Sequence, residues 1–200
     1  MIETDQVQEG WRERKRRETL DRIADTALTL FVKNGYDATT LDAIAEASGI
    51  SRRTFFYYFK SKEEILATWQ RELPETFRAA ILAEPSGQHP FDVLQNAHLK
   101  LIANLDPQKS IAIYRIIRSS EYLLAMNQSK YLKLEQTAFE ALRELWPDKS
   151  RMNAMRIVAM VSVGILRLSL ENWAEGQEGK SLETYLKEEF EEMRKETLKL

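Results

Sequence analysis

The sequence contains no cysteine and only two histidines in 200 residues. The absence of cysteine excludes disulfide bonds, thiol catalysis and cysteine-bound metal, and it fits a reducing cytosol. The two histidines, His89 and His98, are accompanied by no HExxH motif, no Ser-His-Asp order and no glycine-rich phosphate loop. We therefore expect no catalytic residue, no metal site and no cofactor, and we do not expect an enzyme.

Long apolar runs are also missing. The longest uncharged stretch near the C-terminal end covers residues 157–166, which is too short to span a bilayer. Residues 1–17 are polar and end in basic side chains, so the sequence predicts no signal peptide. We expect a soluble, cytoplasmic protein without a membrane partner.

Neither positive nor negative charge is in large excess, and the formal net charge is −2. The basic residues that matter gather at positions 12–17 and 52–62. A locally basic region on a mildly acidic chain is compatible with salt-sensitive binding to nucleic acid. For residues 12–17 two interpretations stay open: an extension that contacts the minor groove of DNA, or the solvated first turns of a helix.

Residues 39–66 have the pattern of two short helices joined by a tight turn and followed by a third helix. Thr40 and Ser51 are helix N-cap types, and each precedes an apolar pattern with helical spacing. Gly49 permits the left-handed backbone that a tight turn between helices requires. Phe55 and Phe59 are four residues apart and should point into the core. This stretch therefore predicts a helix-turn-helix.

The outward face of the second short helix has an unusual composition. On a helical wheel Arg53, Phe56 and Tyr57 point outward, with Arg52 and Thr54 at the flanks, and no acidic residue occurs between positions 50 and 62. Arginine can bond the guanine edge through two hydrogen bonds, phenylalanine can contact the thymine methyl group, and tyrosine or lysine can reach phosphates. The composition therefore favours the major groove of DNA as the partner.

At these residues the chain resembles the TetR family of bacterial transcriptional regulators. The resemblance covers about residues 20–66, through ALTLFVKNGYDATT, IAEASGIS and TFFYYFKSKEEIL. It implies phosphate contacts by Thr40, Tyr57, Tyr58 and Lys62 and base contacts by Arg52, Arg53 and Thr54. Phe56, Tyr58 and Asp42 depart from the family pattern, and Asp42 stands where a basic residue is common. The predicted DNA-binding set is Thr40, Ser51, Arg52, Arg53, Thr54, Phe56, Tyr57, Tyr58 and Lys62.

The whole chain is predicted to be all-α, with about nine helices in two domains. Residues 1–66 form the three-helix DNA-binding domain, with a disordered tail at residues 1–10, and residues 67–200 form a helical bundle. One long helix should run over residues 62–83 with a kink or break near Leu73, because Pro74 cannot donate a backbone hydrogen bond. Residues 84–90 read as a loop, and later helices follow at 90–105, from Pro107, within 121–146, at 150–175 and after Ser181.

The second domain is predicted to form a homodimer and to hold an effector. The helix over residues 150–175 is apolar on nearly every side, and a further apolar stripe follows Ser181, so two copies of both helices could close an interface. The expected interface residues are Val158, Val161, Ile165, Leu186, Phe190 and Met193. His98 should be a buried, hydrogen-bonded core residue or else an effector contact. Arg118 should reach solvent, or it should meet an anionic effector or a buried acid such as Glu121. The candidate effector residues are Trp69, Phe77, His98, Tyr114, Arg118, Met126 and Trp173.

The resemblance implies a dimeric regulator, most often a repressor, that a small hydrophobic effector releases from a two-fold symmetric operator in double-stranded DNA. A bacterial, cytoplasmic, nucleoid-associated location follows from the same resemblance. Two alternatives remain: an effector-free DNA-binding or chromosome-organising protein, and a binding module for lipophilic molecules or acyl groups. A cavity of several hundred Å³ would distinguish the regulator from the former, and sequence-specific DNA binding would distinguish it from the latter.

Overall fold

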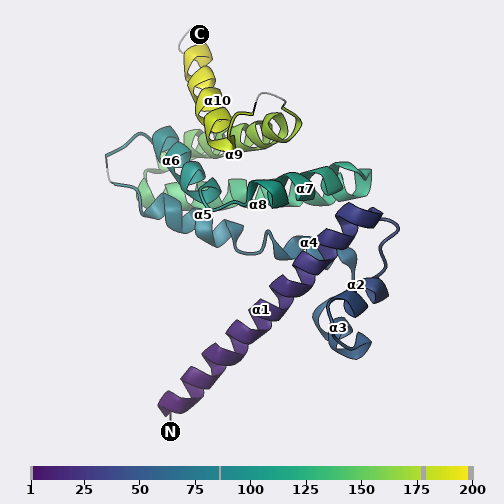
Figure 1. Cartoon of the computed structure of the whole chain (residues 1–200). Coiled ribbons are helices and arrows are strands. Elements are labelled where there is room, and N and C mark those ends of the chain that lie inside the picture. Colours follow the sequence, from purple (N-terminus) through teal and green to yellow (C-terminus); the bar gives the residue numbers. More distant parts are fainter. Residues whose placement is uncertain (1, 86, 177–178, 198–200) are drawn as a thin grey trace. The chain divides into compact units, whose positions relative to one another are not determined.

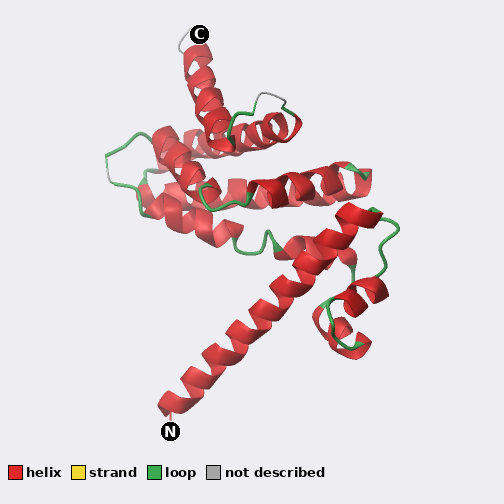
Figure 2. Ribbon diagram, viewed as in Figure 1, coloured by secondary structure: helices red, strands yellow, loops and turns green. Residues whose placement is uncertain are grey.

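The computed structural model describes residues 2–85, 87–176 and 179–197, and these residues form helices and loops without a strand (Figures 1 and 2). The predicted all-α fold is therefore confirmed. The described residues contain ten α-helices and one short 3-10 helix rather than nine helices. The helices are α1 (Ile2–Asn34), α2 (Leu41–Ala47), α3 (Arg52–Tyr58), α4 (Lys62–Thr68), α5 (Leu73–Leu82), α6 (Pro90–Ile102), α7 (Pro107–Arg118), α8 (Glu121–Leu145), η1 (Lys149–Arg151), α9 (Met152–Glu175) and α10 (Leu182–Thr197).

The chain divides into two compact units. The first comprises Met1–Arg71 together with Ile116–Ser120, and the second comprises Glu72–Arg115 together with Glu121–Leu200. Helix α7 therefore begins in the second unit and ends in the first.

The predicted disordered tail at residues 1–10 is wrong for its described part, because α1 begins at Ile2. Residues 2–10 contain no proline and are rich in glutamate and glutamine, which favour helices. A helix that is already nucleated by the packed residues further along can extend through such a segment at little cost. Residues 12–17 lie exposed on α1 as solvated helical turns, and their contact with DNA stays a prediction.

The first unit is a three-helix head completed by α4. Helix α1 packs against both α2 and α4. The largest fully buried side chains of this unit are aromatic or β-branched, and they come from every one of these helices: Ile23, Phe31, Ile44, Phe55, Phe59 and Ile65. Gly35 ends α1 with a φ of 88°, and Gly49 turns the chain between α2 and α3 with a φ of 67°. Both turns need the left-handed backbone that glycine adopts without strain.

The predicted long helix over residues 62–83 is interrupted, as its proline suggested. Helix α4 ends at Thr68, four residues of turn follow, and α5 begins at Leu73. Pro74 lies buried in the first turn of α5, where the missing N–H removes no hydrogen bond within the helix. The interruption explains one of the two additional helical elements, and the 3-10 helix before α9 is the other.

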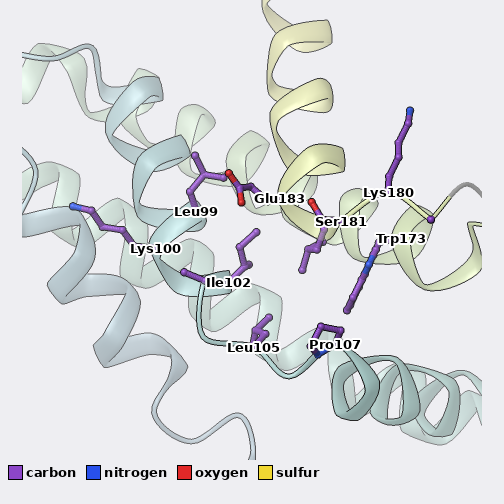
Figure 3. A pocket seen from close by; sticks show the side chains of 12 residues that line it. Leu99, Lys100, Ile102, Leu105, Pro107, Trp173, Lys180, Ser181 and Glu183 are labelled. Atoms are coloured by element: carbon purple, nitrogen blue, oxygen red, sulfur yellow. The ribbon is translucent and has the colours of Figure 1, made fainter.

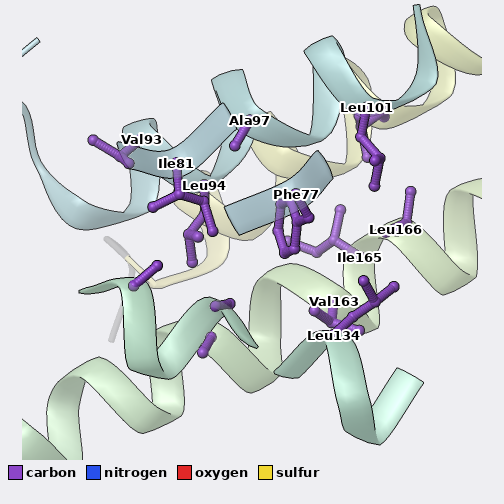
Figure 4. Close-up of a cluster of buried hydrophobic side chains, with 14 of the residues drawn as sticks. Phe77, Ile81, Val93, Leu94, Ala97, Leu101, Leu134, Val163, Ile165 and Leu166 are labelled. Carbon is purple, nitrogen blue, oxygen red and sulfur yellow. The ribbon is translucent and has the colours of Figure 1, made fainter. Parts of the chain in front are cut away.

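The second unit packs α5, α6, α8, α9 and α10 around one hydrophobic core (Figure 4). Phe77 of α5 lies near the middle of the side chains shown, with Leu94 of α6 and Leu134 of α8 in the same cluster. Helix α8 begins at Glu121, at the very start of the range 121–146 in which a helix was predicted, because nothing in residues 121–129 breaks a helix.

Helix α9 is the most apolar element of this unit. Together with the turn before it, the segment Lys149–Glu175 is long and apolar enough by composition to cross a membrane, a property that core helices of globular proteins share. Met155, Ala159 and Val163 on one side of α9 are buried, and the helix packs against α8, α10 and α6. Its opposite side is not covered by the described residues of the chain.

Candidate nucleic-acid interface and ligand groove

Helix α3 is held on the head by its own caps and by two phenylalanines. The Ser51 hydroxyl accepts the Thr54 backbone N–H at 3.1 Å, and the two hydroxyl oxygens lie 2.8 Å apart. Phe55 and Phe59 have almost no exposed surface, and their ring centroids are 6.0 Å apart. This packing fixes which side of α3 faces solvent.

The solvent-facing side of α3 has the predicted composition. Arg52, Arg53 and Thr54 are exposed, and Tyr57 is the most exposed aromatic residue of the head, with 70% of its surface accessible. Phe56 is half-buried against Phe55. The half-buried Tyr58 ring meets Tyr57 edge-on, with ring centroids 5.2 Å apart. The face therefore offers two cations, a hydroxyl and an aromatic edge on one short, rigid helix.

The remaining two predicted DNA contacts also have structural roles within the head. Thr40 caps α2, and its hydroxyl accepts the Ala43 N–H at 3.1 Å. The half-buried Lys62 donates from Nζ to the Tyr36 backbone carbonyl oxygen at 2.6 Å. The same Nζ atom lies 4.2 Å from the centroid of the Tyr36 ring. Lys62 therefore fastens α4 to the segment between α1 and α2, which sequence reasoning missed because the partner is a backbone atom 26 residues away.

Tyr36 connects this fastening to a carboxylate. Its hydroxyl donates to Glu63 Oε1 at 2.8 Å. Burial pushes the pKa of Glu63 upward, but hydrogen bonds from the backbone N–H, Ser61 and Tyr36 and the charge of Lys62 outweigh it, so the pKa lies below its usual value. The carboxylate is therefore held ionised beside Lys62, whereas the buried Ser48 hydroxyl at the end of α2 has no hydrogen-bond partner among the described residues.

One contact on the recognition face joins two helices. Asp42 of α2 forms an ion pair with Arg52 of α3, with 3.0 Å between Oδ1 and Nε. The Arg52 guanidinium also lies over the Phe56 ring, 5.5 Å from its centroid. Sequence reasoning noted the unusual Asp42 but not its partner, because ten residues and a turn separate the two positions.

The candidate effector residues are distributed over both units. Phe77 and His98 stack on each other in the core of the second unit, with centroids 4.4 Å apart. Tyr114 donates from its hydroxyl to Glu175 at 3.0 Å, and Met126 is exposed on α8. Trp69 and Arg118 belong to the first unit.

His98 is fully buried, as expected, but it lacks the expected hydrogen bonds. No described residue supplies a partner for Nδ1 or Nε2. Phe77 covers one face, and the ring of Phe190 lies with its centroid 6.1 Å away. Burial lowers the pKa of His98 to about 3, so the imidazole is neutral at physiological pH. An unpartnered imidazole in an apolar core costs stability.

A groove of about 620 Å³ opens on the second unit where the end of α6 and the start of α7 meet the end of α9 and the start of α10 (Figure 3). Its apolar lining includes Leu99, Ile102, Leu105, Pro107, Trp173 and Leu182. Lys100, which pairs with Glu84, and Lys180, which pairs with Glu188, stand at its polar rim. Trp173 is the one candidate effector residue that lines it. The other lining residues sit at helix ends, which sequence periodicity does not bring together.

The predicted dimer residues divide into two groups. Leu186 and Phe190 have no exposed surface and belong to the core of a single chain, so the structure corrects their assignment to an interface. Their stripe on α10 is covered by α9 and α6 of the same chain. Ile165 is likewise buried, whereas Val158, Val161 and Met193 are half-buried.

The uncovered apolar side chains on α9 are different ones. Ile157, Met160 and Leu168 are 60%, 51% and 49% exposed, and they recur at helical spacing on one side of the helix. Within the described part of α10, through residue 196, the exposed residues are all charged: Glu183, Lys187, Glu188, Glu191, Glu192, Lys195 and Glu196. We call the three apolar residues of α9 the α9 stripe.

Two comparisons concern the sequence. Residues 23–68 match the family model for bacterial regulatory proteins of the tetR family. The chain is 35% identical over 124 residues to the HTH-type transcriptional regulator TcmR of Streptomyces glaucescens, over 58% of this chain and 55% of that protein. It is 32% identical over 94 residues to IcaR of Staphylococcus epidermidis, a negative regulator of the biofilm operon icaADBC, over 47% and 50%. The matches thus span about half the length of these relatives.

Two solved structures resemble the fold. One is a TetR-family regulator from Syntrophomonas wolfei, with a TM-score of 0.66, 16% identity and coverage of 93% of this chain and 96% of that chain. The other is FadR of Thermus thermophilus, a TetR-family repressor in complex with lauroyl-CoA, with a TM-score of 0.55, 22% identity and coverage of 86% and 91%. At these identities the likeness establishes the fold alone.

Proposed function

Because the chain belongs to the TetR family of bacterial regulatory proteins, we propose that it is a sequence-specific DNA-binding transcriptional regulator that represses its target genes. The observation that carries the proposal is the outward face of α3, where Arg52, Arg53, Thr54 and Tyr57 are exposed on a helix that Phe55 locks to the head. A short helix with this composition fits the major groove and supplies both base-reading and phosphate-binding groups.

Residues around the base-reading helix have complementary roles in this proposal. Arg52, Arg53 and Thr54 read bases, and Tyr57, Tyr58 and Thr40 contact phosphates. Lys62 has two roles in this proposal. Its ammonium group donates to a backbone carbonyl oxygen of the head, and its positive charge contacts a phosphate. The regulator acts in the cytoplasm, at the nucleoid when it is bound to DNA.

The functional protein is a homodimer in this proposal, and the α9 stripe supplies its contact. Exposed apolar side chains that recur on one helix face mark a surface that a second apolar surface covers. Two copies of the α9 stripe can meet about a two-fold axis, since a two-fold contact places the same patch on both sides. The operator then has two-fold symmetry, because each head presents the same recognition helix.

The groove of the second unit is the proposed effector site. Its volume suits a small molecule, and its apolar lining with Trp173 suits a hydrophobic one. A related repressor, FadR, is known in complex with lauroyl-CoA, which supports small-molecule control in this fold. An effector shifts operator binding only through a difference in its affinity for two shapes of the protein, typically about 1–3 kcal/mol, or 5- to 150-fold.

Two connections lead from the second unit to the head and would transmit that difference. Helix α7 begins at Pro107, which lines the groove, and its last turn belongs to the first unit. Helix α5, with Pro74 in its first turn, follows α4 after four residues of turn. We propose that an effector in the groove changes the separation of the two heads through these connections.

Selection from a random pool of DNA duplexes tests the proposal. The full chain should enrich a two-fold symmetric sequence, and its affinity should fall steeply as salt rises, because phosphate contacts release counterions. No enrichment over random sequence would remove the assignment as a regulator and favour a DNA-organising protein or a lipophile-binding module.

The effector part has a separate test. Small molecules that co-purify with the protein would be identified by mass spectrometry, and lauroyl-CoA would serve as a defined probe of operator release. Leu105→Trp should fill the groove and abolish the response while operator affinity stays unchanged. A response that survives this substitution would place the effector elsewhere.

A further inference from the structure

The strongest unexplained feature of the head is an acidic side chain next to a face that otherwise carries none. Helix α3 has no acid, but Asp42 reaches its first residue from α2 and pairs with Arg52. Both side chains are more than half exposed, so the pair contributes little to stability in water. A carboxylate near phosphates also repels DNA, which makes this position costly for binding alone.

The geometry of the contact limits what Arg52 can do. Asp42 Oδ1 lies 3.0 Å from Nε, which is the inner edge of the guanidinium, and the Phe56 ring lies beneath the same group. In the part of the chain that the structure describes, the ion pair is made through Nε, and no hydrogen bond involves the two terminal Nη atoms. The guanidinium is thus held at its inner edge and on one face, and its outer end is free.

A guanidinium with a free outer end offers two parallel N–H donors. That fork matches the O6 and N7 acceptors of guanine, whereas adenine presents a donor in place of O6. Holding the fork before binding lowers the side-chain entropy that is lost when the two hydrogen bonds form. The carboxylate also lowers the affinity for DNA of any sequence, because it repels every phosphate alike.

We propose that Asp42 is a positioning residue that presents Arg52 to guanine, and that it raises sequence selectivity at the expense of general DNA affinity. The inference rests on the proposed function, since it assigns a role within DNA reading. It implies a guanine in each half-site at the position that Arg52 contacts. It also explains an acid at a position where the resemblance leads one to expect a basic residue.

Four variants of the full chain separate this role from a structural one. Arg52→Ala locates the base position, because guanine preference there should be lost, by about fivefold or more. Asp42→Asn removes the charge of the partner. Glu46→Gln removes one charge from an exposed position of the same helix, α2, and is the matched control. The double variant Asp42→Asn with Arg52→Ala completes a double-mutant cycle, which measures the coupling between the two side chains.

The readouts are enrichment from a random duplex pool and affinity for random and selected DNA. Asp42→Asn should lower guanine preference at that one position by about threefold or more while affinity for random DNA rises or stays equal. Glu46→Gln should leave guanine preference unchanged. In the Arg52→Ala background, Asp42→Asn should have no further effect on base preference. Thermal unfolding of each variant checks that the head remains folded.

Three outcomes would overturn the inference. Guanine preference that is unchanged in Asp42→Asn, or equally reduced in Glu46→Gln, means that the ion pair does not position Arg52, although the protein still reads DNA. An equal loss in the Arg52→Ala background means that Asp42 acts on α2 rather than on Arg52. A parent protein that enriches no sequence removes the proposed function together with the inference, and this result differs from the other two.

Discussion

Helices α3 and α9 each leave one side uncovered, and the two uncovered sides differ in chemistry. On α3 that side carries arginine, threonine and tyrosine, with Tyr57 70% exposed. On α9 it carries Ile157, Met160 and Leu168 at about half exposure. Guanidinium groups and hydroxyls suit a polar, anionic partner, whereas an apolar stripe suits another apolar surface. The composition of an uncovered face therefore indicates the kind of partner, even within one chain.

Two buried polar side chains, Tyr36 in the first unit and His98 in the second, differ as well. In the first unit the buried hydroxyl of Tyr36 has a carboxylate partner, and Lys62 reaches backbone oxygens. In the second unit His98 is fully buried between aromatic rings, and no described residue bonds its nitrogens. Removing the Tyr36 hydroxyl and removing the His98 ring nitrogens should therefore have opposite effects on stability.

The largest expected effect concerns α9. Met160→Asp places a charge in the centre of the α9 stripe, so the proposed dimer should dissociate, and operator affinity should fall about 100-fold or more with the loss of two-headed binding. Sedimentation and binding to the selected operator would measure both. Leu132→Asp, at a 64% exposed leucine of α8, is the matched control and should leave the dimer intact. A dimer that survives Met160→Asp but not Leu132→Asp would move the interface to α8.

The next effect concerns α3. Arg53→Ala should cost about 1–3 kcal/mol at one or two operator positions and relax base preference there, because it removes the proposed bidentate base contact. Lys62→Ala should instead weaken binding to all sequences alike and lower the salt slope by about one unit, and it should also destabilise the head. Titrations on specific and random DNA across a salt series would separate the two. Equal losses on both DNAs for Arg53→Ala would show that it does not read bases.

His98→Phe should flatten the pH dependence of stability. The folded pKa is about 3 and the ordinary value is 6.5, so the unfolded chain binds the extra proton between these values. The free energy of unfolding therefore has its full value above pH 6.5 and decreases as pH falls towards 3. Between pH 7 and 5 it should decrease by about 2 kcal/mol. Denaturant unfolding of the parent and the variant at both pH values measures the difference.

His98→Phe should also be more stable than the parent at pH 7, by about 1–3 kcal/mol, because it keeps the stacked ring and removes two unpartnered nitrogens. A less stable variant would indicate that the nitrogens have a partner such as a buried water. The same unfolding curves at pH 7 decide between these results.

The smallest effect is the matching substitution in the first unit. Tyr36→Phe removes the hydrogen bond to Glu63 and should destabilise the head by about 0.5–1.5 kcal/mol. Thermal unfolding of the parent and of Tyr36→Phe measures this change in stability. If Tyr36→Phe stabilised the head as His98→Phe is expected to stabilise the second unit, the contrast between Tyr36 and His98 would not hold.

The sequence by itself determined the helices and the recognition motif, because these depend on neighbours within a few residues. Thr40 and Ser51 cap the helices that they were expected to cap, and Gly49 turns the chain where predicted. The break before Pro74 likewise follows from one missing N–H. Local hydrogen bonds and backbone sterics leave little freedom at such positions.

Only the tertiary structure decided which faces are covered and which side chains meet. A stripe on α10 looks the same in the sequence whether its own chain or a second copy covers it, and packing within the chain covers Leu186 and Phe190. The partners of Arg52 and Lys62 lie on other segments, and whether His98 finds a partner depends on several helices at once. Periodicity gives the side of a helix on which a residue lies, but the identity of what lies opposite depends on the three-dimensional arrangement of residues far apart in the chain.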